Sequence, residues 1–325
     1  LALDASDIGP VATLLARSDA LADALAGLHA RVQRAASATC SVLLEIEPET
    51  GRLHPTSGRG LDHLAAEPWC TDEVSRALAR EVLETGRPRQ IAPVEDACPT
   101  LARRLKSPAA YLAPIRFAGR PLGLLVLGLP EVTPPLSWSS AVLECAAGFA
   151  VALTHAKLRH DLALQAEVAS LMALLSQDSI SSLSGERLQA FCLGLARVFG
   201  AERVELWRHN RDAHRLDLVC AAPPVPRGTS PSIPADETAA PVAAALRQTA
   251  PVLSTRRSSS PYDMPHHAAL PPLRGRRRAL GVLVLEHLRL GPGDGARLLP
   301  HFENLASRFA ALLESTELID QIIRA

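Results

Sequence analysis

The sequence has 325 residues, of which 47% are hydrophobic, and its 34 basic and 34 acidic residues give a net charge of zero. This length is sufficient for two domains with sizeable cores. A net charge of zero gives no support for nucleic acid as a partner. The chain has no signal-peptide pattern and no uncharged run of the roughly 18 to 20 residues that a membrane helix needs. We therefore expect a cytoplasmic protein, with no membrane contact and no nucleic-acid binding by this segment.

Motifs of the common enzyme and metal sites are absent from the sequence. There is no H-E-x-x-H, no phosphate-binding G-x-x-x-x-G-K-S/T, no G-x-S-x-G and no deaminase pair of H-x-E with P-C-x-x-C. The six cysteines are scattered, with no C-x-x-C and no short His/Cys spacing of the zinc kind. We expect this segment to be non-catalytic and to hold no metal.

One stretch of the chain occurs twice, as PIRFAGRPLGLLVLG at residues 114–128 and as PLRGRRRALGVLVLE at residues 272–286. In each copy a Pro-apolar-Arg opening is followed, nine residues after the proline, by a glycine, Gly123 or Gly281. The pattern predicts a short strand, an Arg/Gly-rich turn and a buried strand that enters through a glycine where another backbone comes close. The two copies predict a duplicated domain.

Several elements are predicted in the part of the chain that precedes the first repeated stretch. Apolar residues at helical spacing predict a helix at residues 18–36, which leads into a strand at residues 40–47. A further helix ends in LETGRP at residues 83–88, and a short strand follows at residues 90–91 because proline ends the helix and favours extended chain.

The second copy repeats these elements in the same order. The pattern predicts a helix at residues 186–199, a strand at residues 203–208, a helix that ends in LRQTAP at residues 246–251, and a strand at residues 252–253. Residues 221–241 are rich in Pro, Ser and Gly and predict a long irregular loop.

Two long helices are predicted after the repeated stretches. Ser137 can cap a helix that continues to about residue 176 and changes its apolar stripe half-way. From residue 302 to residue 323, a stripe of apolar residues with Thr316 alternates spacings of three and four. This is typical of a coiled-coil seam, which we favour from Thr316 onward, although a one-sided core helix shows the same stripe over its first two turns. We expect a homodimer formed through residues 137–176 and 302–325.

The chain resembles the GAF family of small-molecule sensor domains, twice over. The resemblance rests on SVLLEIEPETGRL with RVELWRHNRDAHRL, on LETGRPRQI, and above all on APIRFAGRPLGLLVLG with PPLRGRRRALGVLVLE. It implies an α+β fold, with two PAS-like GAF domains that each have a five- or six-stranded antiparallel sheet flanked by helices, joined by a long helix. A ligand pocket is implied on the free face of each sheet, roofed by residues 56–110 and 221–269.

The resemblance gives boundaries and a role. The first GAF domain is expected at residues 11–155, a connecting helix and linker at 156–183, the second GAF domain at 184–314 and the start of an output helix at 315–325. Such tandem domains resemble the sensory input region of bacterial signalling proteins. The implied role is to bind a small molecule or sense a redox signal and to pass it through dimeric helices to a further output domain, with a two-component histidine kinase favoured.

The candidate ligand-binding residues come from the variable regions and the strand that follows. They are Trp69, Cys70, Cys98 and Tyr111 in the first pocket and Tyr262, His266 and His267 in the second. The ligand itself stays unknown. Bilin-binding members use a Cys-His dipeptide and cyclic-nucleotide binders an Asn-Lys-Phe-Asp-Glu set, and the sequence has neither. Haem at His266 and His267 is not expected, because adjacent histidines rarely aim at one ion.

Two alternatives stay open at this point. A relative of the GAF fold reduces free methionine sulfoxide with pocket thiolates, and Cys70 and Cys98 supply the two thiols that such an enzyme needs, provided that one has a lowered pKa. The other alternative is a dimerisation scaffold whose pockets are filled by side chains and bind no ligand.

Overall fold

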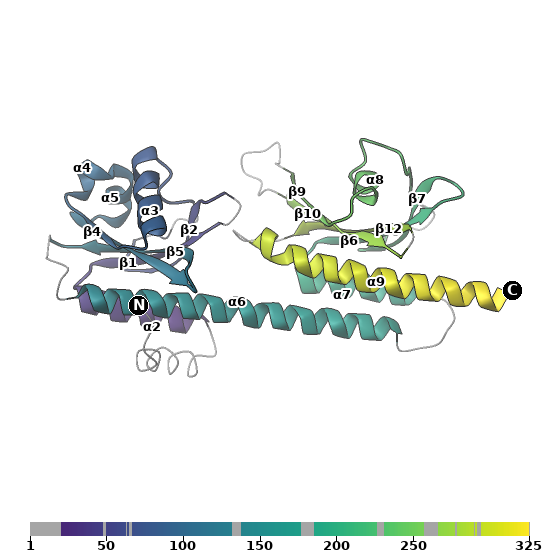
Figure 1. The fold of residues 1–325 in the computed structure, drawn as a ribbon, viewed down its shortest axis with the longest axis horizontal. Coiled ribbons are helices and arrows are strands. Elements are labelled where there is room, and N and C mark those ends of the chain that lie inside the picture. The colour runs from purple at the N-terminus through teal and green to yellow at the C-terminus, as the bar shows by residue number, and fades with distance from the viewer. Residues whose placement is uncertain are drawn as a thin grey trace. The chain divides into compact units, whose positions relative to one another are not determined.

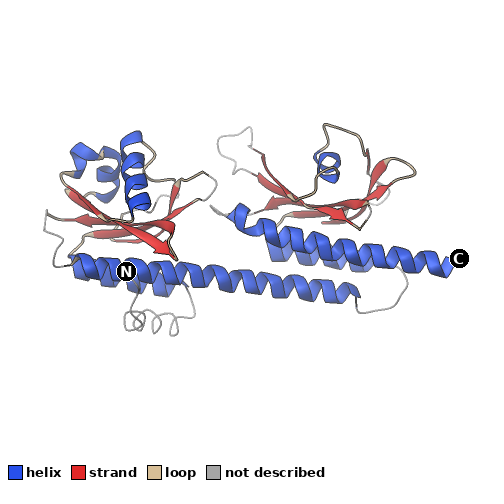
Figure 2. Ribbon diagram, in the orientation of Figure 1, coloured by secondary structure: helices blue, strands red, loops and turns tan. Residues whose placement is uncertain are grey.

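The computed structural model describes residues 21–47, 50–62, 64, 67–131, 138–176, 185–225, 231–256, 266–276, 278–288, 290 and 294–324. The chain divides into two compact units, Leu1–His160 and Asp161–Ala325. Each unit contains one antiparallel sheet with helices against both faces, so each has a mixed α+β architecture (Figure 1, Figure 2). We call the two faces of each sheet the back face, which carries the long helices, and the front face.

The first unit has a five-stranded sheet in the order β2-β1-β5-β4-β3. Its neighbouring strands all pair antiparallel. The described elements are α2 (Leu21–Ala36), β1 (Cys40–Ile46), β2 (Leu53–Arg59), α3 (Glu73–Thr85), β3 (Arg89–Ile91), α4 (Val94–Ala97), α5 (Pro99–Leu105), β4 (Ala109–Phe117), β5 (Arg120–Leu129) and the first part of α6 (Ser139–Ser176).

The two faces of this sheet bury separate apolar layers. On the back face, α2 and α6 pack on alternate residues of the strands, among them Leu43 and Leu125. On the front face, α3, α4 and α5 pack on the intervening residues, among them Leu44 and Leu124. Because successive side chains of a strand point to opposite faces, one apolar strand serves both layers. Continuous apolar runs such as GLLVLG are therefore buried on both sides.

The glycine of the repeated stretch lies where two strands come unusually close. A Cβ atom at Gly123 would lie 2.0 Å from the backbone oxygen of Leu44 in β1, and one at Gly281 would lie 2.0 Å from that of Trp207. Only glycine leaves room for this approach. The predicted reason for a glycine at this point of each copy is confirmed.

The second unit has a seven-stranded sheet in the order β8-β7-β6-β12-β10-β9, with β11 also paired to β12. On its back face, α7, α9 and the second part of α6 pack on the strands, and on its front face α8 does so. The elements are α7 (Gly185–Phe199), β6 (Arg203–Asn210), β7 (Arg215–Ala222), β8 (Ser232–Pro234), α8 (Pro241–Leu246), β9 (Val252–Arg256), β10 (His266–Leu270), β11 (Pro272–Arg274), β12 (Ala279–Leu288) and α9 (Asp294–Arg324).

This sheet differs from the expected five or six strands in two places. Pro271 and Pro272 lie at the break between β10 and β11, which both pair with β12, and proline has no N–H to give to a ladder. In addition, β8 pairs with β7 inside residues 221–241, which the sequence predicts as irregular. The Pro/Ser-rich composition of this segment therefore does not predict the three-residue edge strand β8.

Helix α6 ends at Ser176, as its apolar pattern predicts. Its first part contributes Val142 and Phe149 to the back-face core of the first unit. Its second stripe, which includes Leu164 and Val168, packs in the core of the second unit. By length and composition α6 is also apolar enough to cross a membrane, although 44% of its most apolar window is buried and core helices of soluble proteins share these properties.

A candidate ligand-binding cleft

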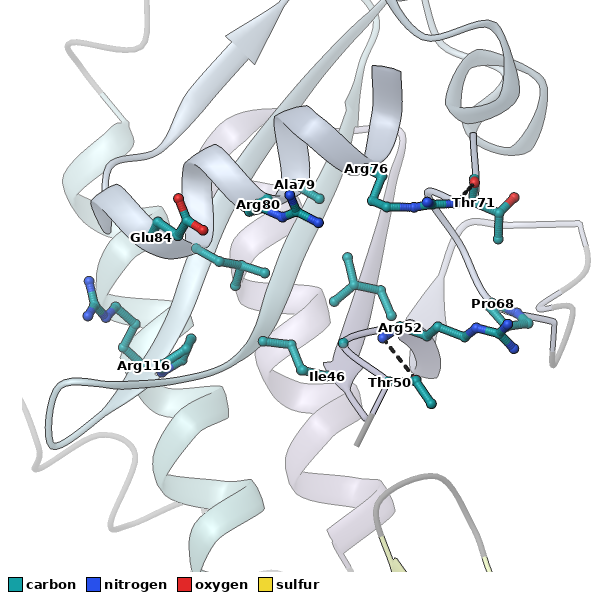
Figure 3. Close-up of a pocket in the computed structure, with 14 residues that line it drawn as sticks. Ile46, Thr50, Arg52, Pro68, Thr71, Arg76, Ala79, Arg80, Glu84 and Arg116 are labelled. Atoms are coloured by element: carbon teal, nitrogen blue, oxygen red, sulfur yellow. Dashed lines mark hydrogen bonds between the residues drawn. The ribbon is translucent and has the colours of Figure 1, made fainter. Parts of the chain in front are cut away.

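A cleft of about 940 Å³ lies on the front face of the first unit, between α3 and the connection from β1 to β2 (Figure 3). Its volume falls in the range of about 300–1,000 Å³ that is usual for small-molecule sites. Ile46 at the end of β1, Leu53 at the start of β2 and Leu83 on α3 provide apolar lining. The cleft therefore has an apolar floor on the strands and a helix above it.

The polar lining of the cleft is dominated by arginine. Arg52, Arg76, Arg80 and Arg116 line it, and Glu84 is the carboxylate among the described lining residues. Arg76 and Arg80 are four residues apart on α3, so they lie on one face of the helix. In Figure 3 these two arginines reach the cleft from the helix, and Arg52 does so from the strand side.

The N-terminus of α3 is held by a polar cap. Asp72 accepts a hydrogen bond from the backbone N–H of Ser75 at 2.9 Å, and the hydroxyl of Thr100 on α5 donates to its other carboxylate oxygen. Burial acts to raise the pKa of Asp72, but these hydrogen bonds outweigh it and lower the pKa to about 2. The cap therefore fixes the helix that carries Arg76 and Arg80.

The arginine of the repeated stretch lies at the C-terminal end of the front-face helix in both units. In the second unit, Arg274 donates to the backbone oxygens of Leu246 at 3.0 Å and Gln248 at 3.1 Å, at the end of α8. In the first unit, the guanidinium of Arg116 lies against Gly86, the left-handed cap residue of α3. Helix-terminal carbonyls lack intrahelical donors, and in the second unit Arg274 supplies them.

The second unit has a more open cleft of about 580 Å³ at the corresponding place. Glu45 pairs with Gly123 and Arg208 pairs with Gly281, so the next residues, Ile46 and His209, occupy equivalent positions. The polar lining is different, and consists of His209, His214, Asp236, Thr238 and Arg247. Among the residues that the structure describes, the arginine group therefore belongs to the first unit.

Trp69 and Cys70 line a separate, smaller pocket of about 250 Å³. Trp69 is 2% exposed and pairs with Leu53, whose oxygen accepts its backbone N–H at 2.8 Å. The guanidinium of Arg104 lies 5.1 Å from the centre of the Trp69 ring, a cation–π distance. These residues support the roof beside the arginine-lined cleft but do not line it.

Cys70 and Cys98 lie close enough to interact electrostatically, and neither forms a disulfide. Burial, with smaller contributions from Cys98 and Asp72, raises the pKa of Cys70 to about 12. Burial also raises the pKa of Cys98. A nucleophilic thiol needs a lowered pKa, so the surroundings of this pair do not favour the thiolate that the thiol-enzyme alternative requires.

The remaining residues that the sequence suggests as ligand contacts are not among the described lining of the arginine-lined cleft. Tyr111 lies on the back face of the sheet, where its ring is 4.8 Å from that of Trp138. In the second unit, Tyr262 lies outside the described residues, and His266 and His267 begin β10, where the side chain of His266 is not described. Within the described parts of the chain, no group of three or more His, Cys, Asp or Glu residues could hold a metal ion.

Sequence reasoning missed the arginines of the cleft. The available signal was the four-residue spacing of Arg76 and Arg80 on a predicted helix, together with Arg52 directly after a predicted turn. In a chain with only two lysines, arginine is the ordinary basic residue. Arginine at these positions therefore does not indicate a binding site until the fold brings the elements together.

Comparison with known proteins gives matches at the level of structure. No family model matches the sequence, and no curated protein matches it. One matching solved structure is the GAF domain of A. aeolicus nlh2 in an inactive state, with 11% identity and a TM-score of 0.39 over 48% of this chain and 98% of that one. Another is the GAF domain from Acinetobacter phosphoenolpyruvate-protein phosphotransferase, with 14% identity and a TM-score of 0.36 over 46% and 92%.

Proposed function

We propose that this chain is a sensory module of tandem GAF-like domains that binds a small molecule in the cleft of the first unit. The observation that carries the proposal is the cleft itself, which combines a volume of about 940 Å³, an apolar floor and a ring of polar side chains. Pockets of this kind are the usual sites for small ligands. The raised thiol pKa values at Cys70 and Cys98 favour this role over thiol chemistry.

A polar connection links the strand below the cleft to α6. Glu45 accepts a hydrogen bond from the hydroxyl of Thr56 at 2.7 Å, and Lys157 of α6 donates to its other oxygen at 2.7 Å. The neighbouring residue, Ile46, lines the cleft on the opposite face of β1. A ligand that shifts the end of β1 thus acts on α6 through Glu45, which supplies the differential contact that signalling requires.

A second connection ties α9 to the sheet of the second unit. The carboxylate of Glu314 accepts the backbone N–H of Arg276, in the turn between β11 and β12, at 3.1 and 3.2 Å. In our proposal α9 leads to an output domain, with a histidine kinase favoured. The turn of the repeated hairpin then contacts the helix that carries the signal onward.

Homodimerisation through α6 and α9 is part of the proposal. Leu158, Leu162 and Leu174 of α6 have exposures of 56%, 65% and 61%. Leucines with this exposure on one helix offer apolar surface for a partner helix. Phe302, Leu305 and Phe309 of the α9 stripe are buried in the core of the second unit. The part of the heptad pattern that favours a second copy of the same chain is therefore the part from Thr316 onward.

A thermal-shift screen of a metabolite library against the full chain tests the ligand-binding role. Leu83→Trp fills the cleft, and Leu78→Trp is its control, because Leu78 is partly buried on the same helix but does not line the cleft. We expect at least one compound to raise the Tm of the wild type and of Leu78→Trp and to leave Leu83→Trp unchanged. Compounds that stabilise all three proteins equally, or none at all, contradict the proposal and favour a ligand-free scaffold.

A further inference from the structure

We propose that the cleft of the first unit takes a small organic dianion, a dicarboxylate or an organic phosphate, held between Arg52 and Arg80. This inference rests on the proposed ligand-binding role of the same cleft. It names the chemical class of the ligand and the two side chains that recognise it.

The argument starts from what each guanidinium of the cleft already binds. The guanidinium of Arg116, which belongs to β4, lies against Gly86 at the end of α3 and donates to the backbone oxygen of Gly119 at 2.7 Å. Arg76 donates to the backbone oxygen of Thr71, beside the cleft. Both are therefore at least partly engaged within the protein.

Arg52 and Arg80 are in a different situation. Within the described ranges of the chain, neither guanidinium has a hydrogen-bond or ion-pair partner, although both line the cleft. Glu84 is the carboxylate of the lining, and its side chain also has no partner among the described residues. The cleft thus keeps an excess of positive charge, with two guanidinium groups free to bind a ligand.

The position of these two arginines sets the shape of the ligand. Arg80 projects from α3 and Arg52 from the chain just before β2, and both line the cleft together with apolar residues that include Ile46 (Figure 3). A guanidinium presents paired N–H donors that match a carboxylate or a phosphate. A molecule with an anionic group at each end and a short apolar body satisfies both arginines and covers the floor.

Arginine-rich composition does not account for this arrangement. The corresponding cleft of the second unit comes from the same chain, yet among its described lining residues Arg247 is the one arginine, and it donates to the backbone oxygen of Ala235 at 3.2 Å. At the position of Leu83-Glu84 in the first unit, the second unit has Leu246-Arg247. Among the described residues, free guanidinium groups therefore gather in one of the two equivalent sites.

Calorimetric titration of the full chain with succinate, with phenyl phosphate and with neutral dimethyl succinate tests the inference. We expect one of the two dianions to bind, its affinity to fall as salt is raised, and dimethyl succinate to bind at least about tenfold more weakly. The better dianion decides between carboxylate and phosphate. Arg52→Gln and Arg80→Gln should each raise its Kd about tenfold or more, while Arg87→Gln, an exposed arginine outside the lining, should leave the Kd unchanged.

Two results overturn the inference and separate it from the proposed function. If neutral compounds bind the wild type, Leu83→Trp abolishes that binding, and Arg52→Gln and Arg80→Gln do not weaken it, the cleft is a ligand site of another chemical class. If neither the dianions nor any compound of the library binds in the cleft, the ligand-binding role itself fails. Circular dichroism of Arg52→Gln and Arg80→Gln checks that these exposed substitutions leave the fold intact.

Discussion

Gly123 in the first sheet and Gly281 in the second each allow two neighbouring strands of their own sheet to approach closely. In each case the nearest atom to an added Cβ is a backbone oxygen, which cannot move aside as a flexible side chain can. The two residues also mark the repeated stretch in the sequence. One steric requirement therefore explains both the sequence signal and the packing of the cleft floor against β5.

Gly123→Ala should lower the free energy of unfolding of the first unit by about 3 kcal/mol or more, because close packing leaves no space for the methyl group. Gly185→Ala is the matched control, since no atom lies within 4 Å of its added Cβ and it begins a helix. The control should change stability by less than about 1 kcal/mol. Denaturant midpoints measure both, and equal midpoints would contradict the steric account.

His29 is a buried histidine on the back face of the first unit. Its ring nitrogens lie 2.8 Å from the hydroxyl of Ser41 and 2.9 Å from that of Ser57. Burial, and to a lesser extent the charge of Arg59, lowers the pKa of His29 from 6.5 to about 4. The folded state therefore holds this histidine neutral at pH values where the unfolded chain binds a proton.

The stability of the chain should consequently fall as the pH drops from 6.5 towards 4, where the unfolded state binds more protons than the folded state. The slope contributed by His29 approaches about 1.4 kcal/mol per pH unit at most. His29→Gln removes this titration and should flatten the profile in that window, even though it is less stable at neutral pH. Parallel profiles for the two proteins would show that His29 does not control the acid response.

At the scale of elements, α3 is the part that turns a sheet face into a cleft. Its N-terminus is bound to α5 through Asp72 and Thr100, and its C-terminus ends at Gly86 against Arg116. The helix carries two of the four arginines of the cleft. A substitution that weakens the contacts at either end of α3 should therefore lower the affinity of the cleft for its ligand.

Asp72→Ala should destabilise the first unit by about 1 kcal/mol at neutral pH, the usual value for the loss of an N-cap. The pKa of about 2 lies below the ordinary 3.8, so the contribution is fully present above pH 3.8 and is lost as the pH falls through 2. Glu73→Ala, next to the cap and exposed, should cost only a few tenths of a kcal/mol. Unfolding curves at several pH values test this, and a difference between wild type and Asp72→Ala that is constant with pH would refute it.

Patterns that are local in sequence allowed much of the fold to be predicted. The repeated hairpins, the end of α6 and its second apolar stripe follow from apolar spacing, glycine and proline. Tyr111 could not be placed, because a strand buried on both sides gives no alternation to show which residues face forward. The cleft could not be predicted either, since Arg52 and Arg80 come from separate elements that only the folded sheet brings together.

At the scale of the whole molecule, the proposed dimer makes a direct prediction. Light scattering on the full chain should give about twice the chain mass of 34.6 kDa. Leu158→Lys combined with Leu162→Lys places charge on exposed leucines of α6 and should yield monomers with an unchanged circular dichroism spectrum. A wild type that stays at 34.6 kDa at high micromolar concentration would contradict dimerisation through these helices.

The central claim is that ligand binding in the cleft of the first unit changes α6 through the contact between Glu45 and Lys157. Amide hydrogen exchange of the full chain, with and without a compound that raises its Tm, tests this claim most directly. We predict changed exchange in α3, at the end of β1 and in α6 around Lys157, and we predict that Lys157→Gln keeps the first two changes and loses the third. Protection confined to α3 and β1 in the wild type, with α6 unaltered, would contradict the account and leave a cleft that binds without signalling.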